Sequence, residues 1–208
     1  MTEDRAMQLS LNELQAECRK ATRGAGLSWG TAEETGQAVA WLAERGINAV
    51  PALLDCLDRG AGQAWADDPI RIGIIIADQA RHLAAGASLT VAQIHQPVLT
   101  LPFLALASRL TGTTMTLSHA DGIWSASAAG ITSSVLTAAA ESSTIQAVTC
   151  GAAEHSPIAA DQLPRRMFRL DLEEVLWQRL QALAHHTYVP ATEQSRLLGA
   201  GAGVTDND

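Results

Sequence analysis

Charged residues are distributed unevenly along this chain of 208 residues, and this distribution constrains the fold more than any other feature. Residues 61–160 contain 3 basic and 6 acidic residues, whereas residues 1–60 contain 6 basic and 9 acidic ones. Residues 161–208 again contain 5 basic and 7 acidic residues. Because charged side chains are rarely buried, the charge-poor middle predicts a stretch that is covered by the two ends of the chain, by a partner subunit, or by both.

The net charge excludes two classes of partner. A formal net charge of −8 lacks the basic surface that a general nucleic-acid binder needs to displace counterions, and it disfavours docking on anionic lipid. The longest stretch without Asp, Glu, Lys or Arg, residues 82–108, has an apolar part much shorter than the ~20 residues of a membrane span. We therefore expect no nucleic-acid partner and no membrane partner.

The cysteines and the first residues of the chain predict a cytoplasmic protein. Residues 1–5 carry acidic groups and precede no apolar segment, which is not the pattern of a signal peptide. Three widely spaced cysteines fit reduced thiols and form neither a disulfide framework nor a zinc pattern: Cys18, Cys56 and Cys150. The adjacent His185 and His186 would diverge by about 100° on a helix and could not easily chelate one ion. We expect no metal and, without a phosphate-loop or dinucleotide motif, no cofactor.

Helix signals dominate the first third of the sequence. Ser10 with Glu13, and Thr31 with Glu34, both have the spacing of a capping box. Apolar residues at helical spacing follow each of them, and glycines end the two predicted helices at Gly24 and Gly46. A third short helix is predicted over residues 50–57.

The remaining sequence predicts a mixture of strands and helices. Five isoleucines within residues 70–76 favour a buried strand over residues 70–78. The dipeptide Asp121-Gly122 between two strand-like runs predicts a hairpin. The other predicted elements are strands over 91–101 and 145–149, a helix from Pro102 to 110, and a final helix over 172–185 capped by Asp171.

These elements predict an α+β fold, in which a helical N-terminal third packs on a mixed α/β body with a C-terminal helix and an irregular tail. The predicted organisation has three parts. They are a helical N-terminal region (1–60), the mixed body with its C-terminal helix (61–198) and a glycine-rich tail (199–208).

Two polar clusters are the candidate sites. The first contains Arg19, Arg23 and Trp29, with Glu33 just beyond, and it fits either an anion pocket or ordinary electrostatics at a helix end. The second follows the only tyrosine and fits either a loop that completes the first site or a tail laid over the domain; its candidate residues are Tyr188, Glu193 and Arg196. In the functional interpretation the arginines and Trp29 bind the ligand, and Glu33, Tyr188 and Glu193 are candidate catalytic groups.

Two resemblances to known families add to this reading. The stretches LSLNEL (9–14), RGAGLSWGTAEE (23–34), YVPATEQSR (188–196) and GAGAGVTDND (199–208) resemble an uncharacterised bacterial family, a domain of unknown function. This resemblance implies a bacterial cytoplasmic protein and no particular activity. The helix-glycine-helix pattern before Arg45-Gly46-Ile47 is similar to the start of type-2 malate/lactate dehydrogenases. That family continues with Asp-Ser-His-Gly, whose histidine is catalytic, whereas this chain continues with Asn48-Ala-Val-Pro, so the resemblance supplies no catalytic residue.

The sequence thus leaves alternative functions open. The first is an oligomeric protein that binds a small anionic metabolite or acts as an accessory subunit of a partner enzyme. The second is a small-metabolite enzyme that uses Arg, Glu and Tyr acid–base chemistry between the N- and C-terminal segments. A third is a protein whose only role is assembly.

Overall fold

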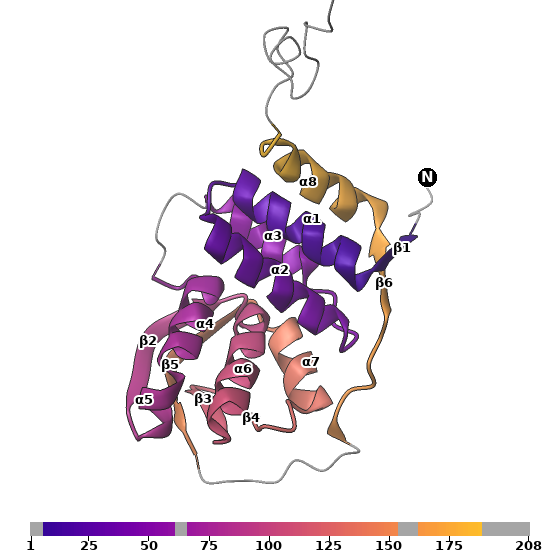
Figure 1. The fold of residues 1–208 in the computed structure, drawn as a ribbon. Helices are drawn as coiled ribbons and strands as arrows, with labels where there is room; N and C mark the ends of the chain where they lie inside the picture. The colour runs from indigo at the N-terminus through magenta and orange to yellow at the C-terminus, as the bar shows by residue number, and fades with distance from the viewer. Residues whose placement is uncertain (1–5, 61–65, 154–161, 189–208) are drawn as a thin grey trace, which may run out of the picture.

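The fold is α+β. A computed structural model describes residues 6–60, 66–153 and 162–188 (Figure 1). Its elements are β1 (Ala6–Ser10), α1 (Leu11–Gly24), α2 (Trp29–Ala43), α3 (Val50–Asp58), α4 (Pro69–Asp78), α5 (Ala80–Ala84), β2 (Ser88–His95), the 3-10 helix η1 (Pro97–Thr100), α6 (Leu101–Thr111), β3 (Met115–His119), β4 (Gly122–Ala126), α7 (Ser133–Glu141), β5 (Thr144–Ala152), β6 (Arg169–Glu173) and α8 (Glu174–His185). No helix in the described ranges is long and apolar enough to cross a membrane.

Segments from both ends of the chain build one unit, which we call the helical half: β1, α1, α2, α3, β6 and α8. Helix α1 packs against α2 and α8, and β1 pairs antiparallel with β6 (Figure 1). Gly24 permits the close crossing of α1 and α8, because a Cβ atom there would lie 1.9 Å from the carbonyl oxygen of Leu183. The predicted division of the chain near residues 60 and 198 stays a prediction, and the second boundary lies outside the described residues.

The charge-poor middle forms the second unit, which we call the sheet half: α4 to α7, η1 and the antiparallel sheet with strand order β2-β5-β3-β4. Helices α4, α5 and α6 pack against this sheet, where Leu117 and Cys150 are buried opposite each other. The other face carries uncharged polar side chains such as Thr90 and Thr149, whose Oγ1 atoms lie 3.5 Å apart. One face of the sheet in the charge-poor stretch is therefore buried, and its other face is open. That a second subunit covers the open face stays a prediction.

Several local predictions are confirmed. The Ser10 box forms, since the Ser10 N–H donates to Glu13 Oε2 at 2.9 Å and the Glu13 N–H donates to Ser10 Oγ at 3.3 Å. Pro102 lies in the first turn of α6, and β3 and β4 form the hairpin around Asp121. The strand predicted over 145–149 is part of β5.

The predicted strand over residues 70–78 is wrong, because these residues form helix α4. The carboxylate of Asp68 caps the helix by accepting the N–H groups of Ile70 and Arg71, and Pro69 occupies the first turn. Caps and a favourable proline outweigh the small intrinsic cost of β-branched residues in a helix. Three of the isoleucines, Ile70, Ile72 and Ile76, are buried.

Three predicted boundaries are also wrong. Helix α2 begins one turn before Thr31, because Ser28 Oγ accepts the Thr31 N–H at 3.1 Å. Strand β2 ends at His95, where Pro97 starts η1 instead of continuing the ladder. The predicted cap Asp171 lies within β6, which pairs with β1, so α8 begins only at Glu174.

Candidate functional site: an arginine-lined pocket between the two halves

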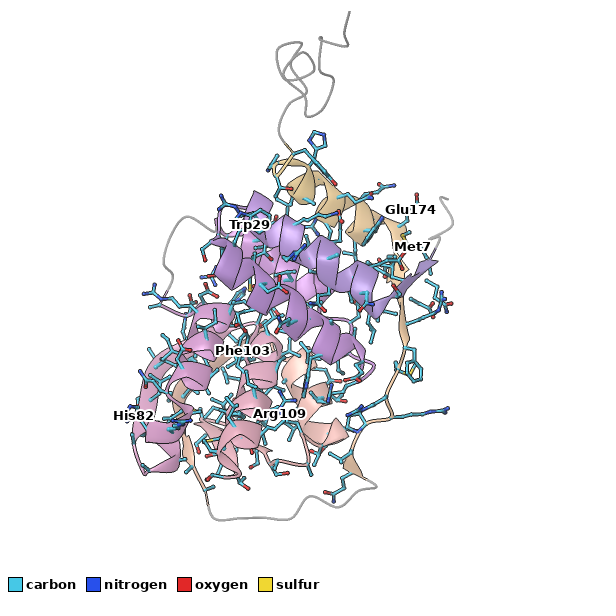
Figure 2. All side chains as sticks on the ribbon, viewed as in Figure 1. Met7, Trp29, His82, Phe103, Arg109 and Glu174 are labelled. Atoms are coloured by element: carbon cyan, nitrogen blue, oxygen red, sulfur yellow. The ribbon has the colours of Figure 1, made fainter. Side chains whose placement is uncertain are left out.

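A cavity of about 230 Å³ lies where the helical half meets the sheet half. Its walls come from α2, from α6, from the turn at residues 127–130 after β4, and from Arg166 in the connection before β6. Figure 2 labels Phe103 and Arg109 on the α6 side. The complete lining is Glu34, Gln37, Ala38, Trp41, Arg45, Pro102, Phe103, Ala105, Leu106, Arg109, Ser127, Ala128, Ala129, Gly130 and Arg166.

Helix α2 supplies the wall from the helical half. Glu34, Ala38, Trp41 and Arg45 are spaced by three or four residues, which places them on one face of the helix and its continuation. The helix ends at Ala43, and Gly46 turns the chain with a φ of 77°. Arg45 therefore sits at the end of the face that meets the sheet half.

Helix α6 supplies the opposite wall in the same way. Pro102, Leu106 and Arg109 follow each other at helical spacing. Phe103 is almost fully buried, and its ring lies against Gly73 of α4, where a Cβ atom would approach Phe103 Cδ2 to 2.3 Å. Gly73 thus fixes the position of the aromatic ring that lines the cavity.

Arg45 is the most constrained cation of the pocket. Its guanidinium lies 3.6 Å from the centre of the Trp41 ring, and its Nη1 donates to the Trp41 carbonyl oxygen at 2.8 Å and to Glu44 Oε2 at 2.7 Å. Burial lowers the pKa of Arg45, Glu44 opposes this shift, and the positive charges of Arg166 and Arg109 lower the pKa further. The two other arginines are therefore close enough to act on Arg45 electrostatically.

The charges of the pocket do not cancel. Arg45, Arg109 and Arg166 face two carboxylates, Glu34 in the lining and Glu44, which also lies 3.7 Å from Arg166 Nε. Three guanidinium groups and two carboxylates leave one net positive charge. Within the described ranges Arg109 forms no ion pair, so its donors are available to a bound anion.

The first predicted cluster lies elsewhere, at the end of α1, and its cations have partners within the protein. Arg19 Nη1 lies 3.0 Å from Glu33 Oε2. Arg23 donates to the Leu27 carbonyl oxygen at 2.8 Å and lies 5.5 Å from the centre of the Trp29 ring. These contacts match the helix-end interpretation of the cluster and do not test ligand binding there.

The second predicted cluster is described only at Tyr188. This side chain is exposed and lies near Lys20 of α1, where it makes a minor contribution, after Glu17, to the raised pKa of Lys20. The structure thus brings Tyr188 to the end of α1. Glu193 and Arg196 lie outside the described residues, so the shared site stays a prediction.

No pattern in the sequence indicates that Arg109 and Arg166 meet Arg45. The three arginines belong to segments that are far apart in the chain, and neither Arg109 nor Arg166 lies in a motif. One local signal was available: Trp41 and Arg45 are four residues apart at the end of a predicted helix, which is the spacing of a stacked pair.

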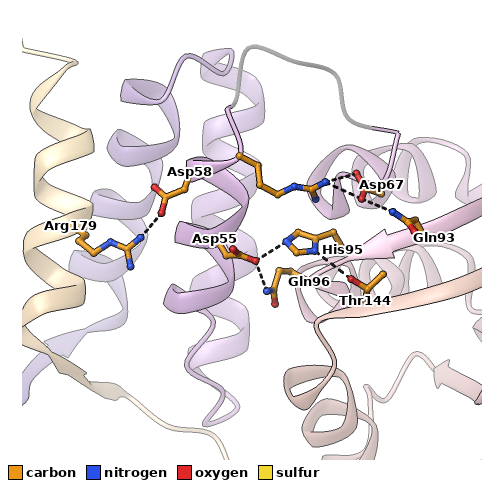
Figure 3. Close-up of polar contacts among 9 residues, drawn as sticks. Asp55, Asp58, Asp67, Gln93, His95, Gln96, Thr144 and Arg179 are labelled. Carbon is orange, nitrogen blue, oxygen red and sulfur yellow. Dashed lines mark hydrogen bonds and ion pairs between the residues drawn. The ribbon is translucent and has the colours of Figure 1, made fainter.

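A separate polar network joins α3 to the sheet half, and we call it the polar joint (Figure 3). Asp55 Oδ2 lies 2.7 Å from His95 Nε2 and accepts a 2.7 Å bond from Gln96 Nε2, while Asp67 bonds to Gln93 and Arg59. The Gln96 bond, together with His95, holds the pKa of Asp55 below its usual range against the effect of burial. Gln96 has a left-handed φ of 45°, and these bonds help to hold that strained residue. The polar joint connects the two halves away from the pocket.

Metal binding and thiol chemistry are two further kinds of chemistry that the sequence raises. No group of three or more His, Cys, Asp or Glu among them could hold a metal ion. Burial raises the pKa of all three thiols, that of Cys150 to about 12, so these thiols are protonated at neutral pH and are poor nucleophiles.

Fold and pocket together describe an α+β protein with a small arginine-lined cavity between two units. Residues 9–81 match a family described as a protein of unknown function, DUF3726. This match covers α1 to α4 and the start of α5, so it includes Trp41 and Arg45 but neither Arg109 nor Arg166. No curated protein and no solved structure gave a significant match.

Proposed function

We propose that this protein binds a small organic anion in the arginine-lined pocket. The observation that carries the proposal is that three guanidinium groups, those of Arg45, Arg109 and Arg166, line one cavity and are only partly neutralised by Glu34 and Glu44. Guanidinium forks bind carboxylates and phosphates through paired hydrogen bonds. The free donors of Arg109 make it the first contact of the anion.

The size and lining of the pocket narrow the ligand. A volume of about 230 Å³ is below the range of roughly 300–1,000 Å³ that holds drug-sized ligands. Trp41, Phe103 and Leu106 offer apolar surface next to the cations. One net positive charge favours a ligand with one negative charge. A planar aromatic monocarboxylate has this combination of size, charge and apolar body.

Benzoate is a suitable probe, and isothermal titration calorimetry is the measurement. We expect benzoate to bind, and the neutral benzamide to bind at least about tenfold more weakly, because the charge-assisted hydrogen bonds to guanidinium are lost. Inorganic phosphate tests the need for the apolar body and is expected to bind more weakly than benzoate.

The variant Arg109→Gln tests the assignment of the anion contact. Benzoate affinity should fall about tenfold, with little change in the free energy of unfolding because Arg109 is exposed and has no ion pair among the described residues. Arg71→Gln is the matched control, since Arg71 is also an exposed arginine on a helix but lies outside the lining. Equal affinity of wild type and Arg109→Gln would contradict the proposal, as would the absence of benzoate binding.

A further inference from the structure

The chain between the sheet half and β6 is an exposed strip that combines arginine with large apolar side chains. We call residues 164–169, Pro-Arg-Arg-Met-Phe-Arg, the basic strip. Phe168 is 84% exposed and Met167 is 45% exposed. Figure 1 shows this segment running along one side of the molecule up to β6. An exposed phenylalanine between arginines is typical of interaction surfaces, where Phe, Met and Arg are enriched.

The backbone of the basic strip is also largely unpaired. The Met167 N–H donates to the Glu44 carbonyl oxygen at 2.6 Å, and no other backbone hydrogen bond joins residues 164–168 to the described part of the chain. An extended segment with free N–H and C=O groups can pair with an additional strand. The strip leads directly into β6, so an added strand would continue an existing ladder.

The charge of the strip gives the chemistry of its partner. Residues 162–170 contain three arginines and no acidic residue, in a chain whose net charge is −8. Arg165 forms no ion pair with the described residues, and Arg166 lies 3.7 Å from Glu44 with most of its side chain exposed. We propose that the basic strip binds an acidic, extended segment of a partner protein, which adds a strand beside it and covers Phe168.

The strip fits a protein segment better than a membrane surface. Free backbone groups need hydrogen-bond partners, which an extended peptide supplies and lipid tails do not. Arg166 also lines the arginine-lined pocket. This proposal rests instead on Arg165, Phe168 and the unpaired backbone, which lie outside the lining, so it does not depend on the anion function.

A fluorescein-labelled peptide that alternates glutamate with valine tests the proposal by fluorescence anisotropy with the full chain. We expect this peptide to bind, and the version with lysine in place of glutamate not to bind. Methylation of the backbone nitrogens of the peptide should abolish binding, because it removes the donors of the added strand. Equal binding of the lysine peptide, or no loss on methylation, would overturn the proposed mode.

Two variants and two matched controls locate the surface. Arg165→Glu should weaken binding at least about tenfold and Phe168→Ser several-fold, and neither should disturb the fold because both side chains are exposed. Arg71→Glu and Ile123→Ser change an exposed arginine and an equally apolar, 64% exposed residue elsewhere, and should bind like wild type. Unchanged binding by Arg165→Glu overturns the proposal. The proposal is also overturned if the protein binds no peptide but binds phosphatidylserine vesicles, and this vesicle binding is lost in Arg165→Glu. That result would assign the strip to lipid binding. Arg165→Glu should retain benzoate binding, so failure here is distinguishable from failure of the proposed function.

Discussion

Two groups of arginines in this molecule have opposite surroundings. At the end of α1, Arg19 and Arg23 come from one helix and find their partners within a few residues or on the neighbouring helix. Between the two halves, Arg45, Arg109 and Arg166 come from three distant segments and surround a cavity of about 230 Å³. Arginines that are close together in the sequence can find hydrogen-bond and ion-pair partners locally, at the end of their own helix and on the neighbouring helix. A cluster assembled by the fold can leave donors free, and free donors beside a cavity are what a ligand needs.

The largest expected effect is that of Arg45→Met compared with Arg19→Met. Arg45→Met removes the stacking on Trp41 and the bond to Glu44, and leaves Glu44 without its closest partner. We expect a loss of about 2 kcal/mol in the free energy of unfolding and at least a tenfold loss of benzoate affinity. Arg19→Met removes only a bridge between partly exposed groups and should change stability little.

Urea unfolding and calorimetry of both variants make this measurement. Similar losses in the free energy of unfolding in Arg45→Met and Arg19→Met would contradict the proposed difference between the pocket arginines and the arginines at the end of α1. A retained benzoate affinity in Arg45→Met would separate the structural role of Arg45 from ligand binding.

A smaller effect is expected when the wall of the pocket is moved by Gly73→Ala. The added methyl group would collide with the Phe103 ring, and such overpacking costs about 1–3 kcal/mol, against a gain of about 1 kcal/mol in helix propensity. We expect a net loss of stability and weaker benzoate binding, because Phe103 lines the cavity. Gly30→Ala, beside Trp29, is the control. Among the described residues, apart from its chain neighbours and the nearby backbone of its own helix, the nearest atom to a Cβ there is Ser28 Oγ at 3.9 Å, so this change should be neutral or slightly stabilising. A stabilised Gly73→Ala with full benzoate affinity would show that Phe103 can shift without consequence.

The smallest effect is a pH dependence in the group at the end of α1. The bond from Arg19, followed by that from Gln37, holds the pKa of Glu33 below its ordinary value of 4.5. A depressed native pKa stabilises the fold above the ordinary value, and this stabilisation is lost as the pH falls through the lowered native value. Glu33→Gln should therefore be slightly less stable than wild type at neutral pH and equal to it in strong acid. Urea unfolding of wild type and Glu33→Gln across this pH range is the measurement. A difference in the free energy of unfolding that stays constant with pH would contradict the expectation.

Some signals that depend on a few neighbouring residues predicted the fold, whereas the caps predicted at Thr31 and Asp171 are wrong, because Ser28 caps α2 and Asp171 pairs within β6. The Ser10 box, Pro102 and Asp121-Gly122 are all found where the sequence placed them, because caps and turns act through local hydrogen bonds and fixed backbone angles. The isoleucines of α4 show the limit of composition. The Asp68-Pro69 start is also a local signal, and it identifies the helix better than the β-branched residues identify a strand.

The candidate site could be predicted only in part, for a physical reason. The periodicity of α2 places Trp41 and Arg45 on one face, but the partner of that face depends on how α6 packs and where the connection before β6 runs. Packing of distant segments has no signature within a single window of sequence. The predicted residues at the end of α1 were conspicuous because they are adjacent in the chain, and adjacency also gives them their internal partners.

The pairing of β1 with β6 has a consequence for the making of the protein. When the ribosome has synthesised α1, α2 and α3, the strand that pairs with β1 and the helix that packs on α1 are still more than a hundred residues away. The helical half therefore remains incomplete until the sheet half has been translated, although its residues are made first. Arg166, just before β6, is synthesised equally late, so the pocket cannot be complete before this segment has been translated.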